Sequence, residues 1–316
     1  MVIISMIAFL VFFPLGGLFS TVVYGQIPYL APANQGQQQQ PPPSEATNQR
    51  TVFNGFDTKV VIITFGDGYQ SQYIYAKPIL DKYGFKANFF VTCNKVGLTS
   101  SKITWQELVQ LYKEGHVIGS KTVNYGTKAK GEGDIDLNHL SANKTEYEVG
   151  QSKQCLLGHG INTTVFAVPK NVASNNQTVI NTIGKYYDFA INGHSNLMYL
   201  NANRYSIGEW SMHHVRTNGT SYDNSQMFSQ FVAVLNSQNK FNKDGMINAI
   251  PVIGYHDIIA AYPDVSSTNQ SSDITLNLFE AEMKYLHDNG FRVITFADLG
   301  YDKNSNSFTF KYSSTF

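Results

Sequence analysis

The sequence predicts an α/β fold with mostly parallel strands, arranged either as an open doubly wound sheet or as a closed barrel. Two observations lead to this prediction. From Lys59 onward, short apolar runs alternate with helix-length amphipathic stretches, an order that implies parallel strands with right-handed crossovers. Seven or eight such strands over roughly 250 residues suit a barrel. We therefore expect a distorted (β/α) barrel with its functional site at the carboxyl ends of the strands.

Each element is predicted from its hydrophobic period. Residues 59–65 (KVVIITF) and 249–255 (AIPVIGY) are continuous apolar runs, as buried strands require, whereas residues 276–289 show the spacing of an amphipathic helix. The full set of expected strands is 59–65, 87–92, 116–120, 164–168, 187–191, 204–208, 249–255 and 292–296. The expected helices are 71–83, 104–114, 144–159, 177–186, 224–236 and 276–289.

Polar residues follow four of these strands directly. They are Asp67, Lys121, Lys170 and the pair His256-Asp257. Because the carboxyl ends of parallel strands meet at one end of a barrel, we expect these side chains to gather at a single mouth. From this shared position we predict that Lys121 forms an ion pair with Asp67, since a half-buried carboxylate needs a cation beside it.

Charge and motif content exclude several classes of function. Lys and Arg together number 23, as do Asp and Glu, so no overall field attracts nucleic acid and we expect no nucleic-acid partner. Cysteine spacing of the zinc-binding kind, a phosphate loop and a dinucleotide fingerprint are all missing from the sequence.

The N-terminal part predicts export. Residues 2–23 carry no charge, and we interpret residues 1–25 as a signal peptide or, because a basic start is lacking, an uncleaved membrane anchor. Residues 26–54 are a Gln- and Pro-rich disordered linker, residues 55–302 the folded domain, and residues 303–316 a C-terminal tail. The expected location is extracellular or in the cell envelope, with membrane contact only through the N-terminal segment.

The two cysteines and the glycosylation sequons bear on the same question. Cys93 and Cys155 form a disulfide in an exported protein or remain two separate buried thiols, and the sequence leaves both readings open. Five Asn-x-Ser/Thr sequons, at Asn143, Asn162, Asn176, Asn218 and Asn269, fit export in an organism that glycosylates outside the membrane.

Several short motifs resemble the polysaccharide deacetylase family, the NodB-homology or carbohydrate esterase 4 group, over about residues 59–301. The family's Thr-Phe-Asp-Asp-Gly corresponds to Thr64-Phe65-Gly66-Asp67-Gly68. The remaining similar runs are residues 112–120 (YKEGHVIGS), 166–169 (FAVP), 255–257 (YHD) and 285–295 (YLHDNGFRVIT). The resemblance implies a NodB-type distorted barrel acting on N-acetylated polysaccharide.

In active members, as the resemblance implies, one Asp and two His hold a divalent metal, zinc or cobalt, and a second Asp serves as base. Asp67 matches the metal-binding Asp, but Gly66 stands at the base position. The family's Ser-His-Thr-x-x-(x)-His becomes Ser120-Lys121-Thr122-Val123-Asn124-Tyr125, which puts Lys121 and Tyr125 in the histidine places. An ammonium has no lone pair for a metal. We therefore expect the metal to bind weakly or not at all.

The other family positions are partly kept. His256 is the general-acid candidate, whereas Pro169-Lys170-Asn171 replaces the family's Pro-Tyr-Gly and Gly254 replaces the Leu of the acetyl pocket. Candidates for a substrate groove are Tyr69, Lys170, Trp210 and Tyr255. The leading hypothesis is an exported deacetylase-like protein with an impaired site, a pseudoenzyme that binds glycan or assists an active relative in the cell envelope.

Two alternatives stay open. The first is an active metal-dependent N-deacetylase, a hydrolase of C–N amide bonds, with a site rebuilt around Asp67 by His139, His213, His214 or Tyr125. The second is a structural surface protein without a ligand.

Overall fold

The computed structural model describes residues 58–125, 135–171, 173, 175–193, 195–211, 224–260 and 273–311. The predicted leader and linker, residues 1–54, lie outside the described residues, as do His213 and His214. Within the described part, none of the helices combines the length and apolar composition that crossing a bilayer requires.

The described strands include all eight that the sequence predicts. They are β1 (Val60–Phe65), β2 (Asn88–Val91), β3 (Val117–Ser120), β4 (Val165–Ala167), β5 (Phe189–Gly193), β6 (Leu197–Tyr199), β7 (Ile207–Gly208), β8 (Trp210–Ser211), β9 (Ala249–Tyr255), β10 (Ile258–Ile259), β11 (Ile274–Thr275), β12 (Arg292–Ile294), β13 (Leu299–Asp302) and β14 (Ser307–Phe310).

The predicted helices are present too, two of them broken into shorter pieces. The α-helices are α1 (Lys77–Lys82), α2 (Trp105–Lys113), α3 (Ala142–Glu146), α4 (Ser152–Gly158), α5 (Gln177–Tyr186), α6 (Asn224–Ser237) and α7 (Leu276–Asp288). The π and 3₁₀ turns are η1 (Gln72–Ala76), η2 (Cys93–Lys95), η3 (Leu137–His139), η4 (Tyr147–Gln151), η5 (Pro169–Asn171), η6 (Gln238–Lys240) and η7 (Phe296–Asp298).

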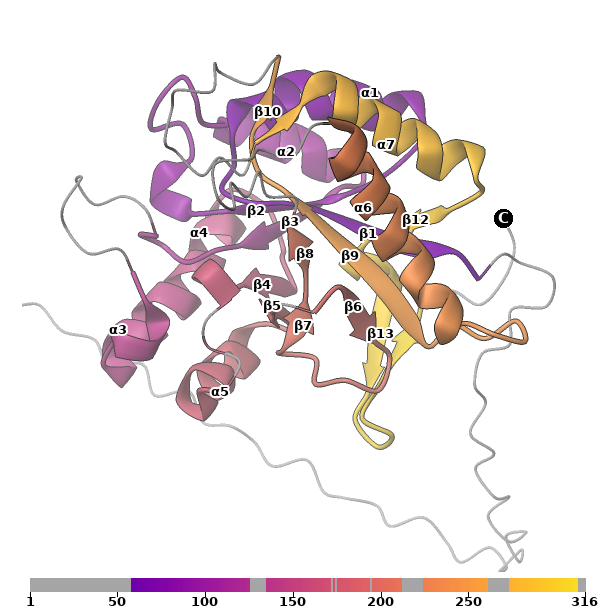
Figure 1. Ribbon diagram of the computed structural model, residues 1–316. Helices are drawn as coiled ribbons and strands as arrows, with labels where there is room; N and C mark the ends of the chain where they lie inside the picture. Colours follow the sequence, from indigo (N-terminus) through magenta and orange to yellow (C-terminus); the bar gives the residue numbers. More distant parts are fainter. Residues whose placement is uncertain are drawn as a thin grey trace, which may run out of the picture. The chain divides into compact units, whose positions relative to one another are not determined.

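The main sheet forms a distorted, mostly parallel barrel, which confirms the predicted fold class (Figure 1). Its order is β9-β1-β2-β3-β4-β5-β7, with β12 beside the start of β1 and β6 antiparallel to β9. Closure comes from one bent segment: β7 pairs with β5, and β8, which follows after Glu209, pairs with β9. Glu209 therefore sits at the point where the barrel closes.

Alternating side chains of the strands divide the core into layers. Val61, Ile63 and Phe65 of β1 pack outward against helices α1, α2, α6 and α7. Val60 and Ile62 point the other way, into a second cluster shared with Val252 of β9. A third cluster joins β4 and β5 to α5. Because the two sides of β1 are apolar, its sequence is a continuous hydrophobic run.

Local signals in the sequence set the helix starts. Thr104 and Glu107 form a capping box at the start of α2, Asn176 accepts a hydrogen bond from Val179 N at α5, and Thr275 caps α7 in the same way. Such caps satisfy backbone N–H groups that have no partner within the helix.

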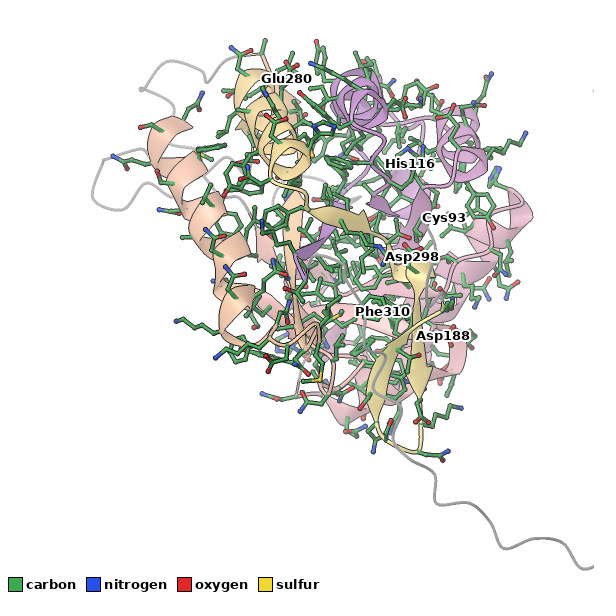
Figure 2. All side chains as sticks on the ribbon, turned by 90° about the vertical axis from the view of Figure 1, so that its right-hand side faces the viewer. Cys93, His116, Asp188, Glu280, Asp298 and Phe310 are labelled. Atoms are coloured by element: carbon green, nitrogen blue, oxygen red, sulfur yellow. A yellow bond between two sulfur atoms is a disulfide. The ribbon has the colours of Figure 1, made fainter. Side chains whose placement is uncertain are left out.

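A disulfide joins Cys93 to Cys155, with their Cα atoms 6.4 Å apart. Of the two readings that the sequence left open, the structure therefore has the bonded one. The bond ties the segment that follows β2 to helix α4, and Cys93 appears in Figure 2 beside the strand ends.

The folded domain continues beyond the predicted boundary at residue 302. Strand β14 pairs antiparallel with β13, and Phe308 is buried against Phe189 with their ring centroids 5.5 Å apart. At least residues 303–311 are therefore part of the domain and not a tail. No apolar run in residues 299–310 is long enough to predict the short hairpin.

Candidate functional site

Of the residues predicted to gather at the mouth, Lys121 and His256 lie around Asp67. Lys121 Nζ lies 2.8 Å from Asp67 Oδ1, and His256 Nε2 lies 3.5 Å from Asp67 Oδ2. The side chains of Asp67 and Lys121 are only 14% and 10% exposed. The predicted ion pair is confirmed, and it is largely shielded from water.

The pair holds both groups in their charged forms. Burial alone would raise the pKa of the Asp67 carboxyl, but Lys121, His256 and Lys102 together hold it well below its usual range. Burial likewise disfavours the Lys121 ammonium, yet the Asp67 carboxylate outweighs that effect and raises the pKa of Lys121. Lys121 therefore remains a cation at neutral pH.

The backbone on both sides of the pair is fixed. Asp67 and Thr122 each have a φ of 68°, in the left-handed region, which is costly for the β-branched Thr122. Glu148 accepts hydrogen bonds from Val123 N at 2.9 Å and from Asn124 N at 3.0 Å. These contacts hold the segment that carries Lys121 against the end of β3.

Gly66, at the family's base position, faces His256. A Cβ placed on Gly66 would lie 3.1 Å from His256 Nε2, tighter than most such contacts. The Gly66 carbonyl accepts a hydrogen bond from Gln72 Nε2 at 2.6 Å, and the same nitrogen donates to His256 O at 2.8 Å. The missing carboxylate is thus accompanied by a close approach of the histidine ring.

Glu209 is a mouth residue that the sequence interpretation missed. Its carboxyl accepts a short hydrogen bond from Thr64 Oγ1, and burial raises its pKa despite Thr64 and the charge of Lys121. A Cβ on Gly254 would lie 2.5 Å from Glu209 Cδ, so the glycine in place of the family's Leu makes room for this carboxyl. Neighbouring residues of a strand point to opposite faces, so a strand at Trp210 would have indicated that Glu209 faces the other side.

Two aromatic residues of the mouth lie against lysines. Lys102 Nζ sits 3.4 Å from the centroid of the Tyr69 ring and donates a hydrogen bond to Asp67 O at 2.9 Å. Burial lowers the pKa of Lys102 to about 8, partly opposed by Asp67. The ring of Tyr125 lies 5.1 Å from Lys121 Nζ. Both tyrosines thus take part in the charged cluster.

The other groove candidates are not gathered with this cluster. Tyr255 is buried, 1% exposed, and donates a hydrogen bond to Glu282 at 2.7 Å, so its expected role in a substrate groove is wrong. Its position in β9 points it outward under α7. Trp210 is partly buried and packs against the outer helical layer. Lys170 is exposed after β4, with a left-handed φ of 60°.

The residues that the resemblance assigns to the metal do not fit one. A divalent cation needs lone pairs directed at it, whereas the Lys121 ammonium lies within hydrogen-bonding distance of Asp67 and offers none. His139, a candidate for a rebuilt site, is 83% exposed in its side chain and pairs with Asp136 at 3.0 Å.

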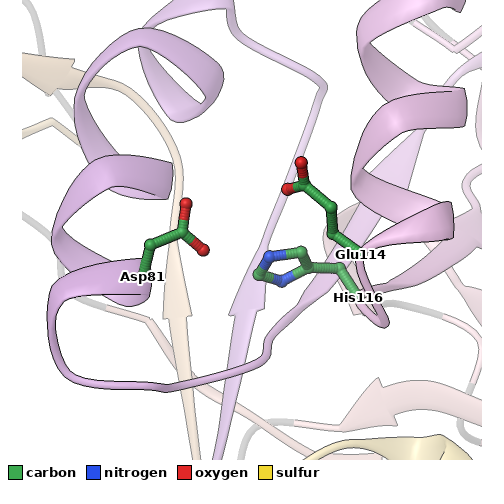
Figure 3. A group of neighbouring side chains, drawn as sticks. All are labelled: Asp81, Glu114 and His116. Atoms are coloured by element: carbon green, nitrogen blue, oxygen red, sulfur yellow. The ribbon is translucent and has the colours of Figure 1, made fainter.

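A second group with metal-ligand chemistry consists of Asp81, Glu114 and His116, whose ligand atoms lie within 4.8 Å of one another (Figure 3). Lys77 Nζ already lies 2.6 Å from Asp81 and 2.8 Å from Glu114. His116 Nδ1 accepts a hydrogen bond from Ala87 N at 3.1 Å. The neutral ring therefore carries its proton on Nε2, which leaves no lone pair there. This group is an ion-pair cluster.

Comparisons of the sequence with known proteins agree with the motifs. The family model described as polysaccharide deacetylase matches residues 54–187. A putative polysaccharide deacetylase, YxkH of Bacillus subtilis, is 30% identical over 112 residues, which are 35% of this chain and 37% of that protein. The matched segment thus spans little more than a third of that relative.

Solved structures of low sequence identity are similar as well. A mutant of the peptidoglycan deacetylase PdaC from Bacillus subtilis has a TM-score of 0.46 at 16% identity, over 76% of this chain and 90% of that one. A family 4 carbohydrate esterase from Streptomyces lividans has a TM-score of 0.45 at 12% identity, over 74% and 91%.

Proposed function

Because this chain carries a polysaccharide deacetylase domain of the NodB-homology, carbohydrate esterase 4 family, we propose that it binds N-acetylated polysaccharide without deacetylating it by that family's metal-dependent route. The observation that carries the proposal is the 2.8 Å contact between Lys121 Nζ and Asp67 Oδ1. It puts a resident ammonium beside the one metal ligand that the chain retains.

The second support is that, in the described part of the chain, a glycine stands at the family's base position beside this pair. Gly66 offers no carboxylate, and the carboxyl of the nearby Glu209 is engaged by the hydroxyl of Thr64. Hydrolysis by the family route needs an activated water and a base to take its proton. His256 Nε2, the general-acid candidate, lies 3.5 Å from Asp67 Oδ2 beside the ion pair.

The mouth nevertheless keeps groups that suit a polar ligand. Lys102 and Lys121 are hydrogen-bond donors, Asp67 is an acceptor, and the exposed Lys170 follows β4 at the same end of the barrel. Amide and hydroxyl groups of an N-acetylated sugar match such a mixture of donors and acceptors.

We further propose that the protein is exported to the cell envelope or beyond, held there by its N-terminal segment or released after cleavage. The disulfide between Cys93 and Cys155 supports this proposal, because such bonds persist in oxidising compartments. The apolar residues 2–23 are the sequence feature in its favour.

The test combines binding and catalysis on one sample. Full-length protein is titrated with chitopentaose and with its fully deacetylated counterpart by calorimetry, and acetate is measured in the same samples with added zinc or cobalt. We expect preferential binding of the acetylated sugar, no acetate release, and weaker binding by Lys170→Gln. Lys240→Gln, an exposed lysine of η6, serves as the matched control and should bind as wild type.

Two results would refute the proposal in different ways. Metal-dependent acetate release would mean that the site is rebuilt and active. Equal or absent binding of both sugars would remove the ligand and favour a structural role.

A further inference from the structure

A pocket of about 570 Å³, whose lining includes several polar and charged residues, lies outside the mouth, between the loop that precedes β7 and the β13–β14 hairpin. Residues of its lining include Asn201, Asn203, Arg204, Tyr205, Tyr301 and Lys303. Arg204 comes before a parallel strand, whereas Asp67, Lys121 and His256 come after strands. The pocket is therefore at the opposite end of the barrel and is a separate feature.

The charged residues of the pocket lining are both cations. Its lining contains Arg204 and Lys303 and no acidic residue, and neither cation forms an ion pair with a carboxylate of the described residues. The Asp302 carboxylate, in the same hairpin, is used within the hairpin turn: it accepts hydrogen bonds from Asn304 N at 2.9 Å and from Ser305 Oγ at 2.7 Å. The whole chain has no net charge, so the excess of positive charge in the pocket lining is a local feature.

One acid does lie close by. Burial and the charge of Asp188 raise the pKa of Tyr205, with Arg204 opposing them. Asp188 is exposed, lies near the hairpin in Figure 2, and is not part of the pocket lining. Its negative charge acts on Tyr205, but Asp188 forms no ion pair with Arg204.

Two aromatic rings fix the Arg204 guanidinium. Its Cζ lies 4.7 Å from the centroid of the Tyr205 ring and 4.9 Å from that of Tyr301. Contacts with ring faces use the π surface of a guanidinium and leave its N–H groups for other partners. The planar fork therefore remains available for an oxyanion.

The loop beneath the guanidinium is held before any ligand binds. Arg204 O accepts a hydrogen bond from Ala190 N at 2.8 Å, and Asn203 Oδ1 accepts one from Tyr205 N at 2.9 Å. Because Asn203 uses its oxygen in the loop, its amide N–H₂ group is left as a donor. A positioned Arg fork with neighbouring donors is the arrangement that recognises carboxylate or phosphate groups.

We propose that this pocket is a second binding site, for an anionic saccharide whose carboxylate or phosphate is bound by Arg204 and Lys303. The side-chain amides of Asn201 and Asn203 and the hydroxyls of the two tyrosines match sugar hydroxyl groups. This inference is independent of the proposed function, because no residue of the mouth lines the pocket. An acidic polymer bound here would be held at the end of the barrel opposite Asp67.

The experiment titrates full-length protein with tetragalacturonic acid, with glucose 6-phosphate and with neutral maltotetraose by calorimetry at fixed ionic strength. The two acidic probes distinguish a carboxylate from a phosphate as the bound group. We expect at least one acidic probe to bind more tightly than maltotetraose, and we expect Arg204→Gln to weaken that binding by about tenfold or more, as for a lost charge-assisted hydrogen bond.

Further variants separate binding from folding. Arg204→Lys keeps the positive charge but loses the planar guanidinium fork, and Lys303→Gln changes an exposed side chain. Both variants should keep the melting temperature of wild type and bind the acidic probe more weakly. Lys240→Gln and the mouth variant Lys170→Gln should bind the acidic probe with the affinity of wild type. The proposal is overturned if maltotetraose binds as tightly as the acidic probes, or if Arg204→Lys and Lys303→Gln both bind like wild type.

Discussion

Two clusters of this domain place a lysine ammonium against carboxylates, and they differ in burial. At the mouth, Lys121 meets Asp67, whose side chain is 14% exposed. In the second cluster, Lys77 meets Asp81 and Glu114, which are 39% and 29% exposed. Water can solvate the carboxylates of the second cluster when the lysine is removed, but it reaches Asp67 poorly.

Metal-binding residue types alone do not make either cluster a metal site. The second cluster has the Asp, Glu and His that the mouth lacks, yet His116 directs its only lone pair at Ala87 N. The mouth has Asp67 at the position where the resemblance implies a metal-binding Asp, yet the Lys121 ammonium lies beside it. In each cluster a lysine ammonium already lies beside the carboxylates, where a metal ion would have to bind.

The largest difference is expected in stability. Lys121→Ala leaves the Asp67 carboxylate without its main cation, and breaking a buried pair in this way costs about 3–5 kcal/mol. Lys77→Ala exposes carboxylates that water can reach, so its cost should stay within about 1 kcal/mol. Urea unfolding of the two variants at pH 7 measures both.

A double variant controls this comparison. Lys121→Met with Asp67→Leu removes both charges and should recover most of the stability that Lys121→Ala loses. Equal losses for Lys121→Ala and Lys77→Ala would contradict the distinction in burial.

A second difference concerns pH. Burial lowers the pKa of His116 to about 4, below its usual 6.5. Between these values the unfolded chain binds the proton and the folded chain does not, so stability should fall by about 3 kcal/mol as the pH drops from 6.5 to 4. Asp67 has a lowered pKa, so its contribution is present above 3.8 and is lost only as the pH falls through the folded value.

Thermal unfolding across pH 4–7 tests this expectation with His116→Gln as the comparison. The variant should lose most of the slope above pH 4, while Asp67→Asn should keep it. A wild-type slope that survives in His116→Gln would show that other groups carry the pH dependence.

The sequence allowed much of the fold to be predicted, because strands such as residues 60–65 and 249–255 are buried on two faces and read as apolar runs. The β13–β14 hairpin was missed, since its four-residue strands mix polar and aromatic residues. Tyr255 directly precedes His256, but neighbouring strand residues point to opposite faces, so Tyr255 lies in the core and not in the groove.

The site was predictable where chain order determines it. Asp67 follows β1 and Lys121 follows β3, the two strands on either side of β2, so their meeting could be predicted. Glu209 could not be placed, because its role depends on where β7 changes its partner to β8 and on the space left by Gly254. Such long-range closure leaves no local pattern in the sequence.

The zinc content of the purified full-length protein, after equilibration with zinc and removal of the free ion, tests the central claim most directly. We predict well under one zinc per chain for wild type, and close to one for Lys121→His combined with Tyr125→His, which gives the family's histidines back to Asp67. One zinc per wild-type chain that is lost on Asp67→Asn would contradict the account, because it would show that the Lys121 ammonium does not exclude the metal.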